Sequence, residues 1–190
     1  HLYIARLKAN GVLDGSFNIG ANGAVNALVI QADGSILVGG AFGSIGGKNR
    51  FFIARLTTND EVDLQFNRPT NGIVFALAVQ PDGKALLGGA FSGVDFKPQT
   101  NIARMNIDAS LDADWLPTTN DAVFALASAA DGGVFAGGAF TVADAAPRNH
   151  VARCDAEGVV DPDFSLTVNG NVLQIVLQPD GDIVLGGSFN

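Results

Sequence analysis

The sequence is short of the residues that hold metals and form disulfides. It contains one cysteine and two histidines in 190 residues. Cys154 therefore has no disulfide partner within the chain, and a lone cysteine does not identify a redox compartment. His1, His150 and Cys154 are too few and too widely spaced for the ligand pattern of a zinc site. We expect no metal and no other cofactor.

Positive charge and long apolar runs are also scarce. Eleven Lys and Arg residues face nineteen Asp and Glu residues, which gives a net charge of −8 and a pI near 4.4. Such a surface repels phosphate backbones, so nucleic acid is excluded as a partner. No apolar run reaches the roughly eighteen residues of a membrane-spanning helix, so we expect no transmembrane segment. The stretch shows no leader peptide and begins with His1, so we expect it to belong to a longer protein.

What the chain has in abundance is repetition. Four near-copies of one twelve-residue motif begin 49 residues apart: QADGSILVGGAF from Gln31, QPDGKALLGGAF from Gln80, AADGGVFAGGAF from Ala129 and QPDGDIVLGGSF from Gln178. The same step separates IARL, IARL, IARM and VARC, which start at Ile4, Ile53, Ile102 and Val151. It also separates four aspartates and four asparagines: Asp14, Asp63, Asp112 and Asp161, and Asn22, Asn71, Asn120 and Asn169. A fixed period of this length indicates a solenoid or a propeller.

Each unit contains four strand-like runs and no helical pattern. In the second unit they are residues 72–80, 84–91, 101–106 and 111–115, and an Asp-Gly turn joins the first two. The first two runs are almost wholly apolar, which predicts strands covered on both faces, whereas the fourth alternates like an outer strand. Four strands in 49 residues favour a β-propeller blade over a solenoid repeat.

The constant spacing of the repeats predicts one propeller domain over residues 1–190. It comprises a half blade (1–20), three antiparallel four-stranded blades (21–69, 70–118 and 119–167) and a second half blade (168–190). We expect the two halves to pair and close a ring of four blades. The alternatives are part of a larger ring, or half of a ring completed by a second copy.

The amino-acid sequence of the repeat resembles that of a known family. NGIVFALAVQPDGKALLGGAF followed by NIARMNIDASLDADW is similar to the bacterial delta-sixty repeat, a propeller-like tandem unit of large bacterial proteins that are often secreted or held at the surface. The resemblance covers the whole chain, although a period of 49 is shorter than is usual in that family. It implies a secreted or cell-surface location and supplies no catalytic residues. The matching residues are Asp82, Gly83, Gly88, Gly89, Phe91, Arg104 and Asp112.

The repeated polar residues have structural explanations. Each Asp-Gly turn offers one carboxylate, far from the six to eight oxygens of a calcium site, so we interpret it as turn chemistry. The glycine pairs lack the lysine and hydroxyl of a phosphate-binding loop and indicate close backbone approach. We predict an ion pair in every repeat between an arginine and the aspartate eight residues later: Arg6 with Asp14, Arg55 with Asp63, Arg104 with Asp112 and Arg153 with Asp161.

Function is expected where the repeats differ, in the loops after each second strand. These loops carry Lys48, Arg50, Lys97 and Arg148, which we interpret as candidate partner-binding residues; simple solubility is the competing explanation. The primary hypothesis is a non-enzymatic scaffold or protein-interaction module. The alternative is a lectin-like propeller that stacks a sugar on an aromatic ring such as Trp115. An enzyme in the central channel is a third class, disfavoured because the inner strands supply almost no polar groups.

Overall fold

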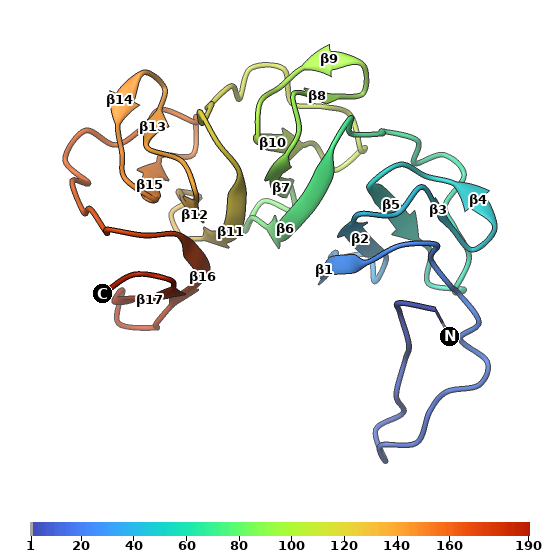
Figure 1. The fold of residues 1–190 in the computed structure, drawn as a ribbon. Helices are drawn as coiled ribbons and strands as arrows, with labels where there is room; N and C mark the ends of the chain where they lie inside the picture. The colour runs from blue at the N-terminus through green and yellow to red at the C-terminus, as the bar shows by residue number, and fades with distance from the viewer. Residues whose placement is uncertain (1) are drawn as a thin grey trace.

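The computed structural model describes residues 2–190, and in this part of the chain every regular element is a β-strand. Figure 1 shows small antiparallel sheets arranged side by side in an open arc, with the two ends of the chain at opposite ends of that arc. The propeller class predicted from the 49-residue period is confirmed. No helix among the described residues is long and apolar enough to cross a membrane.

Three blades share one plan, in which the second strand lies between the first and the third. The first blade contains β1 (Val25–Ile30), β2 (Ile36–Gly40) and β5 (Ile53–Leu56). The second contains β6 (Ile73–Val79), β7 (Ala85–Ala90) and β10 (Ile102–Met105), and the third contains β11 (Val123–Ser128), β12 (Val134–Gly138) and β15 (Val151–Cys154). A last pair, β16 (Val172–Leu177) and β17 (Ile183–Gly187), forms a two-stranded sheet.

The predicted loop between the second and third strands contains a small hairpin in each blade. The hairpins are β3 (Ser44–Ile45) with β4 (Lys48–Asn49), β8 (Gly93–Val94) with β9 (Lys97–Pro98), and β13 (Val142–Ala143) with β14 (Ala146–Pro147). Figure 1 shows them projecting away from the inner strands β1, β6 and β11. We call these the rim hairpins. Each has one buried residue, Ile45, Val94 or Ala143, that bridges to the segment preceding the blade's first strand.

The predicted fourth strand is much shorter than expected. In each blade it is reduced to a single antiparallel bridge: Leu56 with Val62, Met105 with Leu111, and Cys154 with Val160. After this bridge the repeated aspartate accepts hydrogen bonds from the following backbone amides, as Asp63 does from Gln65 and Phe66. A side chain bonded to its own local backbone ends the ladder, because those amides are no longer available to a neighbouring strand. The blades are therefore three-stranded sheets with a bridged outer turn.

The inner strands are less covered than the sequence suggested. Burial alternates along β1 and β11, whereas β2, β7 and β12 are buried along almost their whole length. Leu28 of β1 is 53% exposed, whereas its counterpart Leu77 of β6 packs against the first blade. Phe75 of β6 and Phe124 of β11 pack edge to face across adjacent blades, with ring centroids 5.3 Å apart.

Ring closure between the two half blades does not occur in this structure. β17 pairs only with β16 among the described strands, and Ile4–Leu7 make no ladder with it. Residues 2–20 instead pack beside the first blade, where Ile4 and Phe17 join a core containing Val38 and Ala54. The curvature of the arc keeps the ends apart (Figure 1), so the part-ring alternative remains open.

The blades meet through the first glycine of each Gly-Gly pair. A Cβ placed on Gly88 would lie 2.7 Å from Cγ1 of Val123, which projects from the inner strand of the next blade. The equivalent distances are 2.6 Å from Gly39 to Val74 and 2.5 Å from Gly137 to Val172. Real side chains essentially never approach so closely, so glycine is the residue that lets adjacent sheets come into contact.

A Gly88→Ala substitution should destabilise the protein by about 1–3 kcal/mol, because the added methyl group overpacks the contact with Val123. Chemical denaturation followed by circular dichroism measures this change. Gly43→Ala is the matched control, since its Cβ would meet no atom closer than 3.7 Å. Equal stability of the two variants would contradict the proposed role of glycine between the blades.

Candidate functional site

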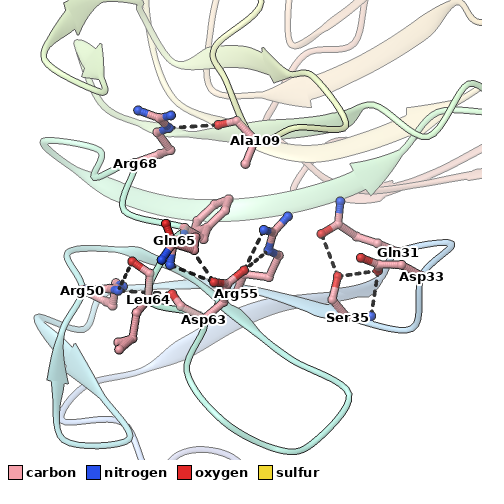
Figure 2. Close-up of polar contacts among 11 residues, drawn as sticks. Gln31, Asp33, Ser35, Arg50, Arg55, Asp63, Leu64, Gln65, Arg68 and Ala109 are labelled. Carbon is pink, nitrogen blue, oxygen red and sulfur yellow. Dashed lines mark hydrogen bonds and ion pairs between the residues drawn. The ribbon is translucent and has the colours of Figure 1, made fainter.

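The repeated arginines each contact the aspartate eight residues later. The shortest nitrogen–oxygen distances are 2.9 Å for Arg6 and Asp14, 2.6 Å for Arg55 and Asp63, 2.9 Å for Arg104 and Asp112, and 2.7 Å for Arg153 and Asp161. Figure 2 shows the Arg55–Asp63 pair and, on Asp63, the hydrogen bond from the amide of Gln65. These pairs tie the third strand to the outer turn of the same blade.

The environment of these aspartates favours their charged form. Hydrogen bonds from the Ser16 hydroxyl and amide, with a further contribution from Arg6, lower the pKa of Asp14 to about 2. Burial alone would raise the pKa of Asp112, but hydrogen bonds from Lys84 and Arg104 outweigh it, and the net pKa is lowered. These carboxylates are structural anions with filled hydrogen-bonding positions, a poor arrangement for proton transfer to a substrate.

Three of these arginines stack on the aromatic residue that follows the aspartate, whereas Arg153 stacks on Phe135. The guanidinium carbon lies 5.2 Å from the ring centre of Phe66 for Arg55, and 5.1 Å from that of Trp115 for Arg104. Trp115 has no exposed surface, so it is a core residue and offers no platform for a sugar. The ring lies in a buried cluster between the second and third blades, together with Leu86 and Val134. The other repeats have a phenylalanine at this position.

The repeated asparagines link the rim hairpins to the rest of each blade. Asn71 Oδ1 accepts hydrogen bonds from the amides of Ser92 and Gly93, both at 2.9 Å. Asn22 and Asn120 make the same pair of bonds in the first and third blades. The sequence showed their period but not this role, because the partners lie 21 and 22 residues away.

The guanidinium groups of two of the four candidate rim residues form hydrogen bonds within their own blade instead of pointing into solvent. Arg50 is buried and donates a hydrogen bond to the carbonyl of Asn49. It donates another to the carbonyl of Asp63 in the outer turn (Figure 2). Arg148 is half-buried and bonds to the equivalent carbonyls of Pro147 and Asp161. Each of the two guanidinium groups braces its rim against the outer turn of the same blade. Arg50 also lines the groove described next, so partner binding by these residues stays a prediction. Lys48 and Lys97 are exposed on the rim hairpins.

A groove of about 790 Å³ lies between the rims of the first two blades. Phe51 and Phe96 line it with exposed fractions of 51% and 93%, and Pro69 and Pro98 add further apolar surface. Lys97 supplies the exposed charge, and three asparagines supply amide groups: Asn49, Asn67 and Asn71. An aromatic groove with one cation and several amides can bind a partner, whereas nothing in this set activates a nucleophile.

Phe96 is the residue that the sequence interpretation missed. It lies at the tip of a rim hairpin with φ of 61°, at the position that Gly47 and Ala145 occupy in the other blades. A phenylalanine in the left-handed region is uncommon, and a nearly fully exposed one gains nothing from burial. The signal available in the sequence was that one repeat departs from small residues at this turn.

The candidate soft metal ligands do not converge among the described residues. Burial raises the pKa of the Cys154 thiol to about 12, and its sulfur lies 3.7 Å from the Val134 carbonyl oxygen. Nδ1 of His150 lies 3.2 Å from the carbonyl oxygen of Gly138. His1 lies outside the residues that the structure describes. In residues 2–190, no three His, Cys, Asp or Glu side chains cluster as metal ligands would.

One family model matches the repeats directly. Described as a domain of unknown function (DUF5122) beta-propeller, it matches residues 31–66, 80–114 and 129–164, which together make up more than half of the chain. The chain belongs to the DUF5122 β-propeller family. The match confirms a tandem propeller repeat, and each matched segment runs from the Asp-Gly turn to the outer turn of one blade. No curated protein matches this DUF5122 chain in sequence.

Solved structures share the fold of the DUF5122 propeller. The WD40 beta propeller domain of Doa1 aligns with a TM-score of 0.62 at 17% identity, over 88% of this chain and 49% of that one. The extracellular domain of the putative one component system BT4673 from B. thetaiotaomicron aligns with a TM-score of 0.51 at 13% identity, over 86% of this chain and 18% of that one. The chain thus spans about half of the first structure and a smaller part of the second.

The Asp112→Asn variant should be less stable than the wild-type protein by roughly 3 kcal/mol at neutral pH, because Arg104 and Lys84 lose their common anion. A carboxylate whose pKa is lowered on folding contributes stability that is present above its unfolded pKa of about 3.9 and is lost as the pH falls below it. The difference between the two proteins should therefore shrink below about pH 4. Urea unfolding across this pH range measures it, with the exposed Asp114→Asn as control; a difference that does not change with pH would contradict this prediction.

Proposed function

We propose that this DUF5122 propeller is a non-enzymatic protein-interaction module, and that the groove between its first two rims is the binding site. The observation that carries the proposal is Phe96, an aromatic side chain 93% exposed at a hairpin tip in a left-handed conformation. Neither core packing nor turn geometry accounts for a phenylalanine there. Contact with a partner does account for it.

The chemistry of the groove defines the partner. Phe51, Phe96 and Pro98 offer apolar surface, and Lys97 lies on the same hairpin as Phe96. The body of the protein carries a net charge of −8, so an exposed lysine at the rim offers a local site for a carboxylate. The fitting partner is a protein segment that presents an apolar side chain beside an acidic residue.

The structural role of the repeated polar residues supports a binding function over a catalytic one. The arginines, aspartates and asparagines at the repeat positions each contact the blade that carries them. We propose a secreted or cell-surface location. The support for it is the extracellular domain with which the chain shares its fold, together with the resemblance to repeats of bacterial surface proteins.

A carbohydrate is the second candidate ligand, because the groove combines two exposed phenylalanine rings with the amides of Asn49 and Asn67. Aromatic faces and amide groups are the usual surfaces for sugar rings and hydroxyls. A glycan array probed with the wild-type protein and with the Phe96→Ala variant separates this ligand from a peptide.

Peptides selected from a displayed random library should bind the wild-type protein and should bind the Phe96→Ala variant about tenfold or more weakly, since truncating a central aromatic anchor costs about 1.4 kcal/mol or more. Isothermal titration of each selected peptide measures the change. Ile107→Ala is the matched control, because Ile107 is 67% exposed and does not line the groove. Lys97→Ala should weaken only the acidic peptides.

Both Phe96→Ala and Lys97→Ala should leave the unfolding transition unchanged, because the two side chains are exposed. Selected peptides that bind wild-type and Phe96→Ala proteins equally would place the binding surface elsewhere. Substitutions are preferable to deletion of the whole rim loop, since Val94 in the same hairpin is fully buried.

A further inference from the structure

A polar pocket of about 390 Å³ lies between the second and third blades. It is lined by the turn between β6 and β7, the turn between β11 and β12, and the outer turn of the third blade. These turns lie at the opposite end of the second strands from the rim hairpins, because each second strand runs from one to the other. The pocket is therefore at the other end of the blades from the groove between the first two rims.

Gln80 lines this pocket with a buried amide that has one unpaired end. The residue is 3% exposed, and its Nε2 donates a 2.6 Å hydrogen bond to the carbonyl of Gly132, which lines the pocket too. This bond fixes the orientation of the amide, because only its nitrogen can donate. Oε1 has no hydrogen-bond donor among the described residues. A buried acceptor is costly to leave unpaired, which favours a ligand that brings a donor to Gln80.

The first blade shows how this acceptor can be paired within the chain. Gln31 occupies the position of Gln80, and the hydroxyl of Ser35 lies 3.1 Å from its Oε1. The same hydroxyl lies 2.6 Å from Oδ1 of Asp33. One donor group therefore lies between an amide oxygen and a carboxylate oxygen.

The second blade has Lys84 at the position of this serine. Its ammonium group lies 3.0 Å from Asp112 and makes no hydrogen bond to Gln80. Asp82, at the position of the aspartate, accepts the Lys84 amide at 3.0 Å, as its counterpart in the first blade accepts a serine amide at 2.9 Å. The Gln80 amide oxygen and the Asp82 carboxylate thus form an acceptor pair without a side-chain donor from their own blade.

The other charged side chains of the lining are already paired, with one exception. Lys84 and Arg104 share Asp112, and Asp131 lies 2.7 Å from Arg153. Within residues 2–190, no basic side chain pairs with the two remaining acidic residues, Asp82 and Glu157. Carboxylates beside an amide oxygen favour a cation that donates hydrogen bonds. A metal ion fits less well, because no three His, Cys, Asp or Glu side chains in this part of the chain cluster as its ligands would.

We propose that this pocket binds a primary ammonium group, which donates hydrogen bonds to Gln80 Oε1 and to the carboxylates of Asp82 and Glu157. An ammonium group has three donors, one for each of these acceptors. It can belong to a lysine side chain of a partner protein or to a free alkylamine. The site is independent of the rim groove, because none of these three residues lines that groove.

An NMR titration with Nα-acetyl-lysine methylamide tests the site. The side-chain amide resonances of Gln80 should shift to saturation as this compound is added. They are identified by their loss in Gln80→Ala, a change that the fold should tolerate because Ala129 holds this position in the third blade. The norleucine analogue, which has the same carbon chain without the ammonium group, should leave the resonances in place. An equal shift with norleucine, or no shift with the lysine compound or with a free amine, would overturn the proposal.

Pentylamine distinguishes the two sources of the ammonium group. A shift of the Gln80 resonances with pentylamine indicates that a free alkylamine is sufficient. A shift with the lysine compound alone indicates a lysine side chain of a partner protein, because the peptide groups then contribute to binding.

Glu157→Gln should weaken binding of the lysine compound about two- to fivefold, the size of effect expected for one exposed ion pair. Glu61→Gln is the matched control, because Glu61 is exposed on the outer turn of the first blade and its substitution removes the same charge. Equal weakening by both substitutions would contradict a defined site, since the net charge of −8 would then attract the amine wherever it lies.

Lys84→Ser separates the acceptor pair from simple charge attraction. The hydroxyl would lie between Gln80 and Asp82 as that of Ser35 lies between their counterparts, so binding should weaken about tenfold or more. Charge attraction alone predicts tighter binding, because the substitution removes a positive charge from the lining of the pocket. Lys48→Ser, on the rim of the first blade, is the matched control, and circular dichroism checks that each variant is folded. Binding to Lys84→Ser that equals or exceeds binding to the wild-type protein would sink the proposal.

Discussion

The fold depends on the contact between a glycine in the second strand of one blade and a valine on the inner strand of the next. Without a side chain at Gly39, Gly88 and Gly137, adjacent sheets approach until the valine rests against the backbone. The adjoining residues Leu37 and Leu86 are buried by the same approach. Because this contact sets the spacing and turn of the blades, the curvature of the whole arc is encoded in one position of the repeat.

The interior of each blade was predictable because its signals are local. The Asp-Gly turn fixes the hairpin of the first two strands, and Gly83, with φ of 86°, has the conformation that such a turn requires. The eight-residue separation of Arg55 and Asp63 placed their side chains on adjoining segments, where the structure contains an ion pair. The fourth strand was overpredicted because Asp63 bonds to its own backbone, a competition that apolar periodicity does not reveal.

The groove between the first two rims and the failure of the ring to close could not be predicted, because both depend on the three-dimensional arrangement of whole blades. Arg50 and Lys48 stand two residues apart in one loop, yet one braces carbonyls of the outer turn and the other faces solvent. Both are basic residues of the same loop, so the sequence does not distinguish their roles. Only the position of the outer turn in three dimensions shows which of them has a structural contact. Closure likewise depends on the summed curvature of three contacts, which no single repeat displays.

The groove and the contacts between blades differ in their relation to the repeat. The contacts between blades reuse positions that all repeats share, such as Gly39, Gly88 and Gly137, so the sequence displays them as a period. The groove instead has Phe96 in its lining, at the position where the other blades have the small residues Gly47 and Ala145. One change at an exposed hairpin tip therefore adds an aromatic side chain to a single blade without altering the packing that holds the blades together.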